Sequence, residues 1–164
     1  FLNVGNGAFG SDVTSTTETD LFTLNNDKPG AYNCPFSWMA NSGVILVRAF
    51  GIYSGPLTVP TMRWRVFFGS VVIAESTIEA LPANRTGEWV LSSESYFNAV
   101  GSNVITKGFI IVGDTSINRE HRLISGNATV DTNGAGLSLR FTWGAGVGVK
   151  SLVLEGGSIQ AVRG

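Results

Sequence analysis

The feature that most constrains the fold is the segment of residues 61–76, which has the pattern of a single β-hairpin. Between Met62 and Phe68 every second residue is a large apolar one, and a period of two is typical of a strand with one buried face. Gly69 and Ser70 follow, and glycine at the first central position favours a type II′ turn, whose twist matches the flanking strands. The segment therefore predicts a fold built from antiparallel strands.

A two-residue turn also fixes which residues of the hairpin lie opposite one another. The expected cross-strand pairs are Phe68 with Val71, Val66 with Ile73, and Trp64 with Glu75. The expected core face consists of Met62, Trp64, Val66 and Phe68. Arg63 and Arg65 share the opposite face with Phe67, where they are either solvated or paired with carboxylates of a partner subunit. We favour the second alternative and expect both arginines at a subunit interface.

Length and composition limit the class of protein. The 164 residues predict one domain that is large enough to bury its own core. Charged residues make up 14% of the chain, against about 25% in an average domain, which indicates that partners cover part of the surface. The net charge of −1 does not suit a nucleic-acid partner, and the longest apolar run, residues 44–47, is too short to cross a membrane. We expect neither partner.

The chain divides into an N-terminal arm and a β-domain. Residues 1–17 are dominated by Gly, Asn, Ser and Thr, which predicts an extended arm, and residues 18–164 form the domain. Scattered apolar residues in the arm indicate that it packs on another surface, such as that of a neighbouring subunit. The arm residues expected at that interface are Phe1, Leu2, Val4 and Phe9.

About eight strands are expected in the domain, and no segment has a sustained helical period. Besides the hairpin, the strands are predicted at residues 19–24, 44–53, 88–97, 103–112, 136–143 and 149–162, with a short one possible at 128–130. Val44, Leu46, Phe50 and Ile52 share one face of their strand, and Gly156-Gly157 predicts a bulge in the last strand. The connection at 25–42 and a polar insertion at 113–126 suit Greek-key crossovers, so the pattern predicts an antiparallel jelly-roll sandwich.

No motif for catalysis, nucleotide binding or metal binding stands out. Residues 144–151 are rich in glycine, but they continue into a strand, whereas a phosphate-binding loop must open a helix. His121 is the only histidine and is expected to be solvated, and the lone Cys34 is expected to be buried. We expect no cofactor, no metal and no enzymatic activity.

Two weaker possibilities stay open. A glycosidase or lyase needs two facing carboxylates, and the candidates are Glu75, Glu88, Glu94, Asp114 and Asp131, of which Glu75 deserves most interest because the expected register puts it beside Trp64. Glu75 is otherwise expected to pair with an arginine near a sheet edge. A ligand surface needs exposed aromatic residues, and the best candidates are Tyr32, Phe36 and Trp38 in the irregular segment 31–42, although packing explains them more simply.

Several stretches resemble a group of small jelly-roll proteins from tailed bacteriophages. They are TETDLF at 17–22, GVILVRAFGIY at 43–53, MRWRVFFGSVVIAES at 62–76, TGEWVL at 86–91, LSLRFTW at 137–143 and SLVLEGGSIQ at 151–160. The resemblance spans residues 17–162 and consists mostly of pattern and order. It implies a virion component: a head decoration or cement protein, or a fibre or tip domain, commonly a homotrimer and without a catalytic motif.

From this resemblance we expect a non-enzymatic structural protein on the capsid surface of a tailed bacteriophage. It would be a homotrimer that contacts the major capsid protein or other virion proteins and stabilises the head. The alternative is a receptor-binding or glycan-binding domain of a tail fibre or spike.

Overall fold

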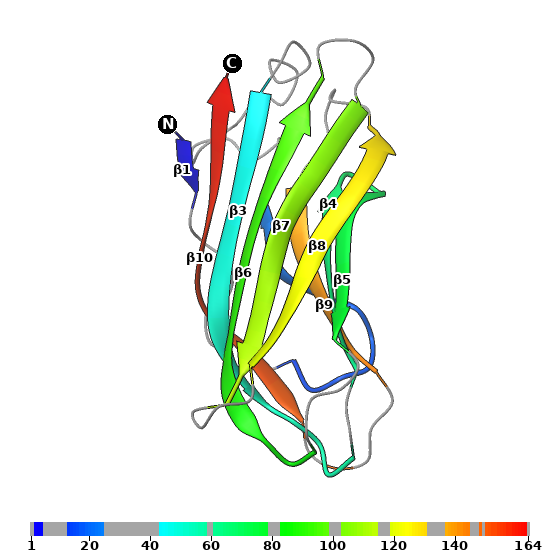
Figure 1. Cartoon of the computed structure of the whole chain (residues 1–164), viewed down its shortest axis with the longest axis vertical. Coiled ribbons are helices and arrows are strands. Elements are labelled where there is room, and N and C mark those ends of the chain that lie inside the picture. The colour runs from blue at the N-terminus through cyan, green and yellow to red at the C-terminus, as the bar shows by residue number, and fades with distance from the viewer. Residues whose placement is uncertain are drawn as a thin grey trace.

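The computed structural model describes residues 2–4, 13–24, 43–58, 61–78, 83–98, 103–114, 119–130, 137–144, 148 and 150–163. Within these residues every regular element is a β-strand, as Figure 1 shows. The strands are β1 (Leu2–Val4), β2 (Thr19–Leu24), β3 (Gly43–Ser54), β4 (Met62–Phe68), β5 (Val71–Ile78), β6 (Thr86–Phe97), β7 (Asn103–Gly113), β8 (Arg119–Thr129), β9 (Leu137–Trp143) and β10 (Ser151–Arg163). The described residues contain no helix that is long and apolar enough to cross a membrane.

The ten strands form one antiparallel sheet in the order β1-β10-β3-β6-β7-β8-β5-β4-β9-β2. The sheet folds over on itself into two layers (Figure 1). The front layer consists of β1, β10, β3, β6, β7 and β8, and the back layer consists of β5, β4, β9 and β2. Between β8 and β5, where the sheet turns from one layer into the other, the only bridged pair is Glu75 with Ser125. The expected all-β antiparallel class is confirmed.

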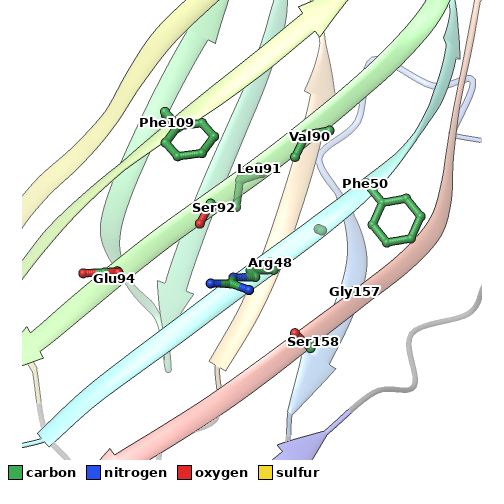
Figure 2. A pocket seen from close by; sticks show the side chains of 10 residues that line it. Arg48, Phe50, Val90, Leu91, Ser92, Glu94, Phe109, Gly157 and Ser158 are labelled. Atoms are coloured by element: carbon green, nitrogen blue, oxygen red, sulfur yellow. The ribbon is translucent and has the colours of Figure 1, made fainter.

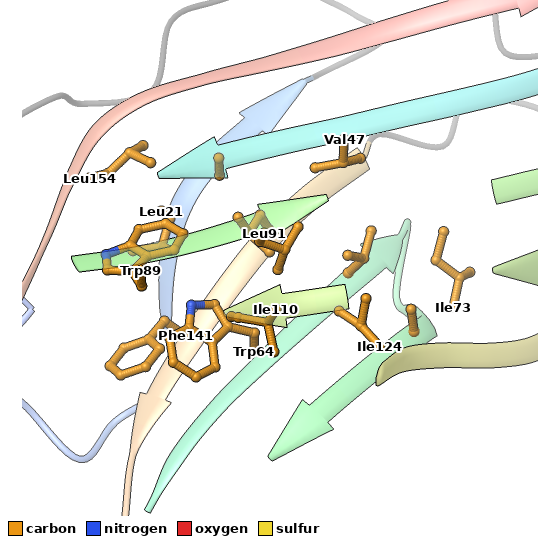
Figure 3. Close-up of a cluster of buried hydrophobic side chains, with 14 of the residues drawn as sticks. Leu21, Val47, Trp64, Ile73, Trp89, Leu91, Ile110, Ile124, Phe141 and Leu154 are labelled. Carbon is orange, nitrogen blue, oxygen red and sulfur yellow. The ribbon is translucent and has the colours of Figure 1, made fainter. Parts of the chain in front are cut away.

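Large aromatic side chains fill the space between the layers. The ring of Trp64 in β4 lies 6.1 Å from that of Trp89 in β6 and 4.9 Å from that of Phe141 in β9. Figure 3 shows these three rings at the centre of the core, surrounded by aliphatic residues of both layers. Phe68 and Phe97 make a second contact between the layers at 5.3 Å. Ring contacts of this kind stabilise the packing beyond the area that they bury.

The hairpin predicted from the sequence is present as β4 and β5. Gly69 has a φ of 59°, as the first central residue of a type II′ turn requires, and all four residues of the expected core face are buried. The expected pair of Phe68 with Val71 is confirmed, but the two pairs expected beyond it are wrong, because the ladder shifts between Val66 and Phe67. Ile73 is an extra residue in β5, so Trp64 lies opposite Ser76. The shift is a β-bulge, and it allows the consecutive residues Ile73 and Ala74 both to be buried.

Two strands lie where none was expected. β1 falls within the predicted arm, and β8 occupies most of the predicted polar insertion at 113–126, so the prediction of an insertion there is wrong. β8 pairs with β7 along its whole length, yet Ile124 is its only fully buried apolar side chain among the described residues. Since few of its side chains reach the core, β8 carries little of the apolar alternation by which strands are recognised. The bulge expected at Gly156 is confirmed by a register shift there.

Candidate functional site

The outer surface of the back layer carries a row of charged residues. Asp20, Arg140, Arg65 and Glu75 are successive cross-strand neighbours on β2, β9, β4 and β5. Arg140 Nε lies 2.6 Å from Asp20 Oδ1, and Arg65 Nε donates to Glu75 Oε2 at 2.9 Å. Glu18 joins the two arginines, at 3.1 Å from Arg65 Nη1 and 3.7 Å from Arg140 Nη1. The adjacent arginines are therefore neutralised by carboxylates of the same chain.

The arginines that were expected at a subunit interface, Arg63 and Arg65, both lie on this charged surface. Arg65 makes its ion pairs within the chain, and the Arg140 guanidinium covers the ring of Phe67 at 4.1 Å from its centre. Arg63 is half-buried on the same surface, and the structure gives it no ion pair with another described residue. Glu75 does not lie opposite Trp64 but opposite Arg65, so the expectation that it pairs with an arginine is confirmed.

The outer surface of the front layer exposes many large hydrophobic side chains. We define the front face as the outward side chains of β10, β3, β6, β7 and β8. Its exposed large hydrophobic residues are Val162, Phe50, Ile52, Val90, Tyr96, Ile105, Phe109 and Leu123. Leu123 is the extreme case, with 80% of its surface exposed. The two outer surfaces of the molecule are thus chemically unlike, one ion-paired and the other apolar.

A hollow of about 670 Å³ lies in the front face, over β10, β3, β6 and β7. Figure 2 shows Phe50 and Phe109 on opposite sides of it, with Ser92 and Arg48 between them. The β10 bulge shapes the hollow, because a Cβ on Gly156 would lie only 2.3 Å from the Phe50 ring. Glycine at this position therefore allows the ring to lie directly against the β10 backbone.

The hollow also contains one charge of each sign. Arg48 is exposed and has no ion pair with any residue that the structure describes. The carboxylate of Glu94 accepts a hydrogen bond from the Tyr96 hydroxyl, and this bond, together with the negative charge of Glu94, raises the pKa of Tyr96. Apolar walls with one cation and one carboxylate can bind an apolar side chain or the face of a sugar ring. No nucleophile with an adjacent base lies in the hollow.

Among the described residues, the remaining carboxylate candidates do not form a facing pair. Asp114 is buried at the end of β7, where its Oδ2 lies 3.5 Å from Arg85 Nη1. Glu88 is exposed on the front face, and Asp131 lies outside the described residues. His121 is exposed, as expected, and no group of three His, Cys, Asp or Glu residues suited to a metal ion occurs in the described part of the chain.

The described parts of the predicted arm lie along the chain's own β10. Leu2 and Val4 belong to β1, where they pair with Ala161 and Ile159. Further on, Val13 exchanges two backbone hydrogen bonds with Leu152, at 2.9 and 3.2 Å. The carbonyl of Val13 also accepts a hydrogen bond of 2.8 Å from the indole of Trp143, and the Val13 side chain is buried. Val13 thus connects β10 of the front layer with β9 of the back layer.

Several residues singled out in the sequence lie outside the described residues. They are Phe1, Phe9, Tyr32, Cys34, Phe36 and Trp38. The roles suggested for them stay predictions, as do the interface roles of Leu2, Val4, Arg63 and Arg65. The sequence-based candidates did not include the hollow. A signal for it exists in β3, where Phe50 and Ile52 point outward while Ile45 and Val47 point into the core, so that both faces of one strand are apolar.

Comparison with known proteins gives no family assignment. No family model matches the chain, and no curated protein matches it. A lectin from Bauhinia forficata in complex with GalNAc matches with a TM-score of 0.32 and 6% identity, over 93% of this chain and 79% of the lectin. The CBM2 module of an evolved Dit of Lactobacillus casei BL23 phage J-1 matches with a TM-score of 0.36 and 11% identity, over 98% of this chain and 81% of that module's chain. Likeness at this level carries no argument about what the chain does.

Proposed function

We propose that the chain is a non-enzymatic structural protein of a tailed-bacteriophage particle. It acts as a homotrimer on the capsid surface, where it contacts the major capsid protein and stabilises the head. The observation that supports this best is the contrast between the two outer surfaces: the back layer is ion-paired, whereas the front face exposes eight large hydrophobic residues. Several exposed large hydrophobic residues on one face are typical of a surface that another protein covers.

The order of the strands supports the jelly-roll part of the proposal. The strands β1-β10-β3-β6 and β5-β4-β9-β2 have the neighbours of the two four-stranded sheets of a jelly roll, and the chain crosses between them in the corresponding sequence. The hairpin formed by β7 and β8 is then an addition to the edge of the first sheet. This is the fold implied by the resemblance of residues 17–162 to small virion proteins.

The proposed action is mechanical. A trimer at a junction of shell subunits touches several of them at once, so that many modest contacts add up through multivalency. The low fraction of charged residues agrees with a surface that is partly covered in the assembly. Neither nucleic acid nor membrane is a partner in this proposal.

Purified particles provide the test. The protein is expected in intact virions in stoichiometric amount, and a cryo-EM reconstruction should place it on the capsid surface with threefold symmetry. Particles that lack it should release their genome at a lower temperature than complete particles. A protein that is monomeric when purified and absent from intact particles would contradict the proposal.

A second function is supported by the hollow itself. Phenyl rings on two sides of polar groups suit a sugar ring, so the chain could instead be a receptor-binding or glycan-binding domain of a tail fibre or spike. In that case a glycan array should give binding that is lost in Phe50→Ala and Phe109→Ala and kept in Val72→Ala, a control in β5. The protein would then be found at the tail rather than on the head.

A further inference from the structure

We infer that the front face binds a second copy of this chain, with Leu123 of one copy inserted into the hollow of the next. The inference deepens the proposed function, on whose homotrimer it rests, by naming the contact that holds the trimer together. It starts from two features of the same face that fit each other: a projecting leucine and a recess with apolar walls.

Leu123 and the hollow lie in one row of cross-strand neighbours. The row runs through Ser158, Arg48, Ser92, Phe109 and Leu123, on β10, β3, β6, β7 and β8. All members except Leu123 line the hollow, while Leu123 lies beyond it on the strand where the front layer ends. A leucine that is 80% exposed gains free energy when a partner buries it, and the phenyl rings of the hollow supply apolar walls for it.

The charges of the two parts of the face are complementary. Among the described outward side chains of β10, β3 and β6, Arg48 stands against three exposed carboxylates, which are Glu88, Glu94 and Glu155, and these four groups have a formal charge of −2. On the described outward positions of β7 and β8, the ionisable residues are Lys107 and His121, and no carboxylate occurs there. The carboxylate of Glu120, near the beginning of β8, forms an ion pair of 3.2 Å with Arg122. Lys107 therefore makes the part with the leucine positive, and the carboxylates make negative the part that forms most of the hollow, which favours contact between unlike parts of two copies.

A contact between unlike parts can be made twice about a two-fold axis or can repeat head to tail, and the homotrimer of the proposed function requires the second arrangement. Each copy then offers Leu123 to one neighbour and its hollow to another, and such head-to-tail contacts close into a ring when the rotation between copies allows it. The trimer is the smallest ring of this type. In the ring, β8 at the border of the front layer of one copy packs against the front face of the next copy.

Two variants test the contact from its two sides. Leu123→Asp removes the apolar side chain and places a charge between the apolar walls of the recess, and Ser92→Trp fills the hollow. Each is expected to weaken the association of the full chain by about 100-fold or more, so that the trimer seen by sedimentation velocity and native mass spectrometry becomes a monomer. The matched controls are Leu57→Asp, at an exposed leucine outside the front face, and Thr77→Trp, on the outer surface of β5; both should remain trimeric.

Mixing the two variants gives a sharper test. Leu123→Asp keeps its hollow and Ser92→Trp keeps its leucine, so a mixture should form one-to-one complexes although each variant alone is monomeric. Circular dichroism and unfolding curves verify that both variants are folded. A mixture that stays monomeric, while both variants are folded and the controls are trimeric, would overturn the inference.

The outcomes separate this inference from the proposed function. If the unmodified chain is a trimer that neither variant disturbs, another surface holds the trimer, and the virion assignment stands without this contact. If the chain is monomeric at high micromolar concentration but present in particles, the inference is again wrong and the assignment stands. If Leu123→Asp breaks the trimer but the protein is absent from particles, the contact stands and the proposed function is wrong.

Discussion

Gly51 is the point where the indole of Trp89 crosses β3. The Trp89 Nε1–H group donates to the carbonyl of Val153 on β10, at 3.2 Å, across the strand that lies between them. A Cβ on Gly51 would lie 1.9 Å from that carbonyl oxygen and 2.9 Å from the indole nitrogen. The hydrogen bond therefore requires that residue 51 has no side chain.

We predict that Gly51→Ala lowers the free energy of unfolding by about 3 kcal/mol, because it overpacks the site and displaces the hydrogen bond. Urea denaturation monitored by tryptophan fluorescence measures the loss. Trp89→Phe keeps an aromatic ring but removes the donor, and it should cost about 1–2 kcal/mol. Equal losses in the two variants would mean that the steric contact at Gly51 contributes nothing.

Tyr53 gives a prediction about pH. Burial raises the pKa of this phenol, and the nearby charge of Asp114 raises it further, while Arg85 lowers it in part. Since the folded state favours the neutral phenol, this contribution to stability is fully present below the ordinary pKa of about 10 and is lost as the pH rises through the higher pKa of the folded state. When the pH is raised from about 8 to about 11, the free energy of unfolding should therefore fall more in the unmodified protein than in the Tyr53→Phe variant. Unfolding curves of the two proteins that shift in parallel over this range would contradict the assigned role of Tyr53.

At the scale of whole elements, the sequence predicted strands better than it predicted their faces. In β4 and β9 the buried and outward residues differ in chemistry, and the buried face was therefore evident. In β3 and β7 both faces are apolar, so a period of two cannot show which one is buried. The two phenyl rings of the candidate site, Phe50 and Phe109, lie on the outward faces of these two ambiguous strands. Its location was for this reason not predictable from alternation alone.

The register of the hairpin failed for a different physical reason. A bulge adds one residue to one strand, and no glycine or proline marks the bulge at Ile73. By contrast, the bulge in β10 was predicted because Gly156 and Gly157 marked it. The order of strands across the sheet results from contacts that are distant in the sequence, which the local alternation of side chains does not specify.

The charged row on the back layer allows a prediction of how much its ion pairs stabilise the folded protein. Replacing Arg140 by methionine removes its ion pairs with Asp20 and Glu18 and its charge above Phe67. Because these groups are partly exposed, we expect a loss of only about 1 kcal/mol of unfolding free energy, smaller at high salt. Arg63→Met, on the same surface but without an ion pair to a described residue, serves as the control. A double-mutant cycle with Asp20→Asn isolates the pair, and a coupling energy of zero would show that the row contributes no stability.

At the scale of the whole molecule, the unlike outer surfaces lead to a prediction about heat stability. If the front face is covered by other copies, unfolding is coupled to dissociation, and the midpoint temperature depends on protein concentration. We expect it to rise by about 2–4 °C for each tenfold increase in concentration. Differential scanning fluorimetry over a dilution series measures the slope, and Leu123→Asp should abolish it. A flat series for the unmodified chain would mean that no other copy covers the face.

The order of the strands has a consequence for synthesis on the ribosome. Among the described residues, β1 pairs only with β10 and β2 only with β9, and Val13 binds to both β9 and β10. During synthesis, β1 and β2 therefore have no described partner in the sheet until residues 137–163 have been made. Their unpaired edges are open to other nascent chains during that interval. Slower elongation over residues 137–163 would prolong this exposure to misassembly.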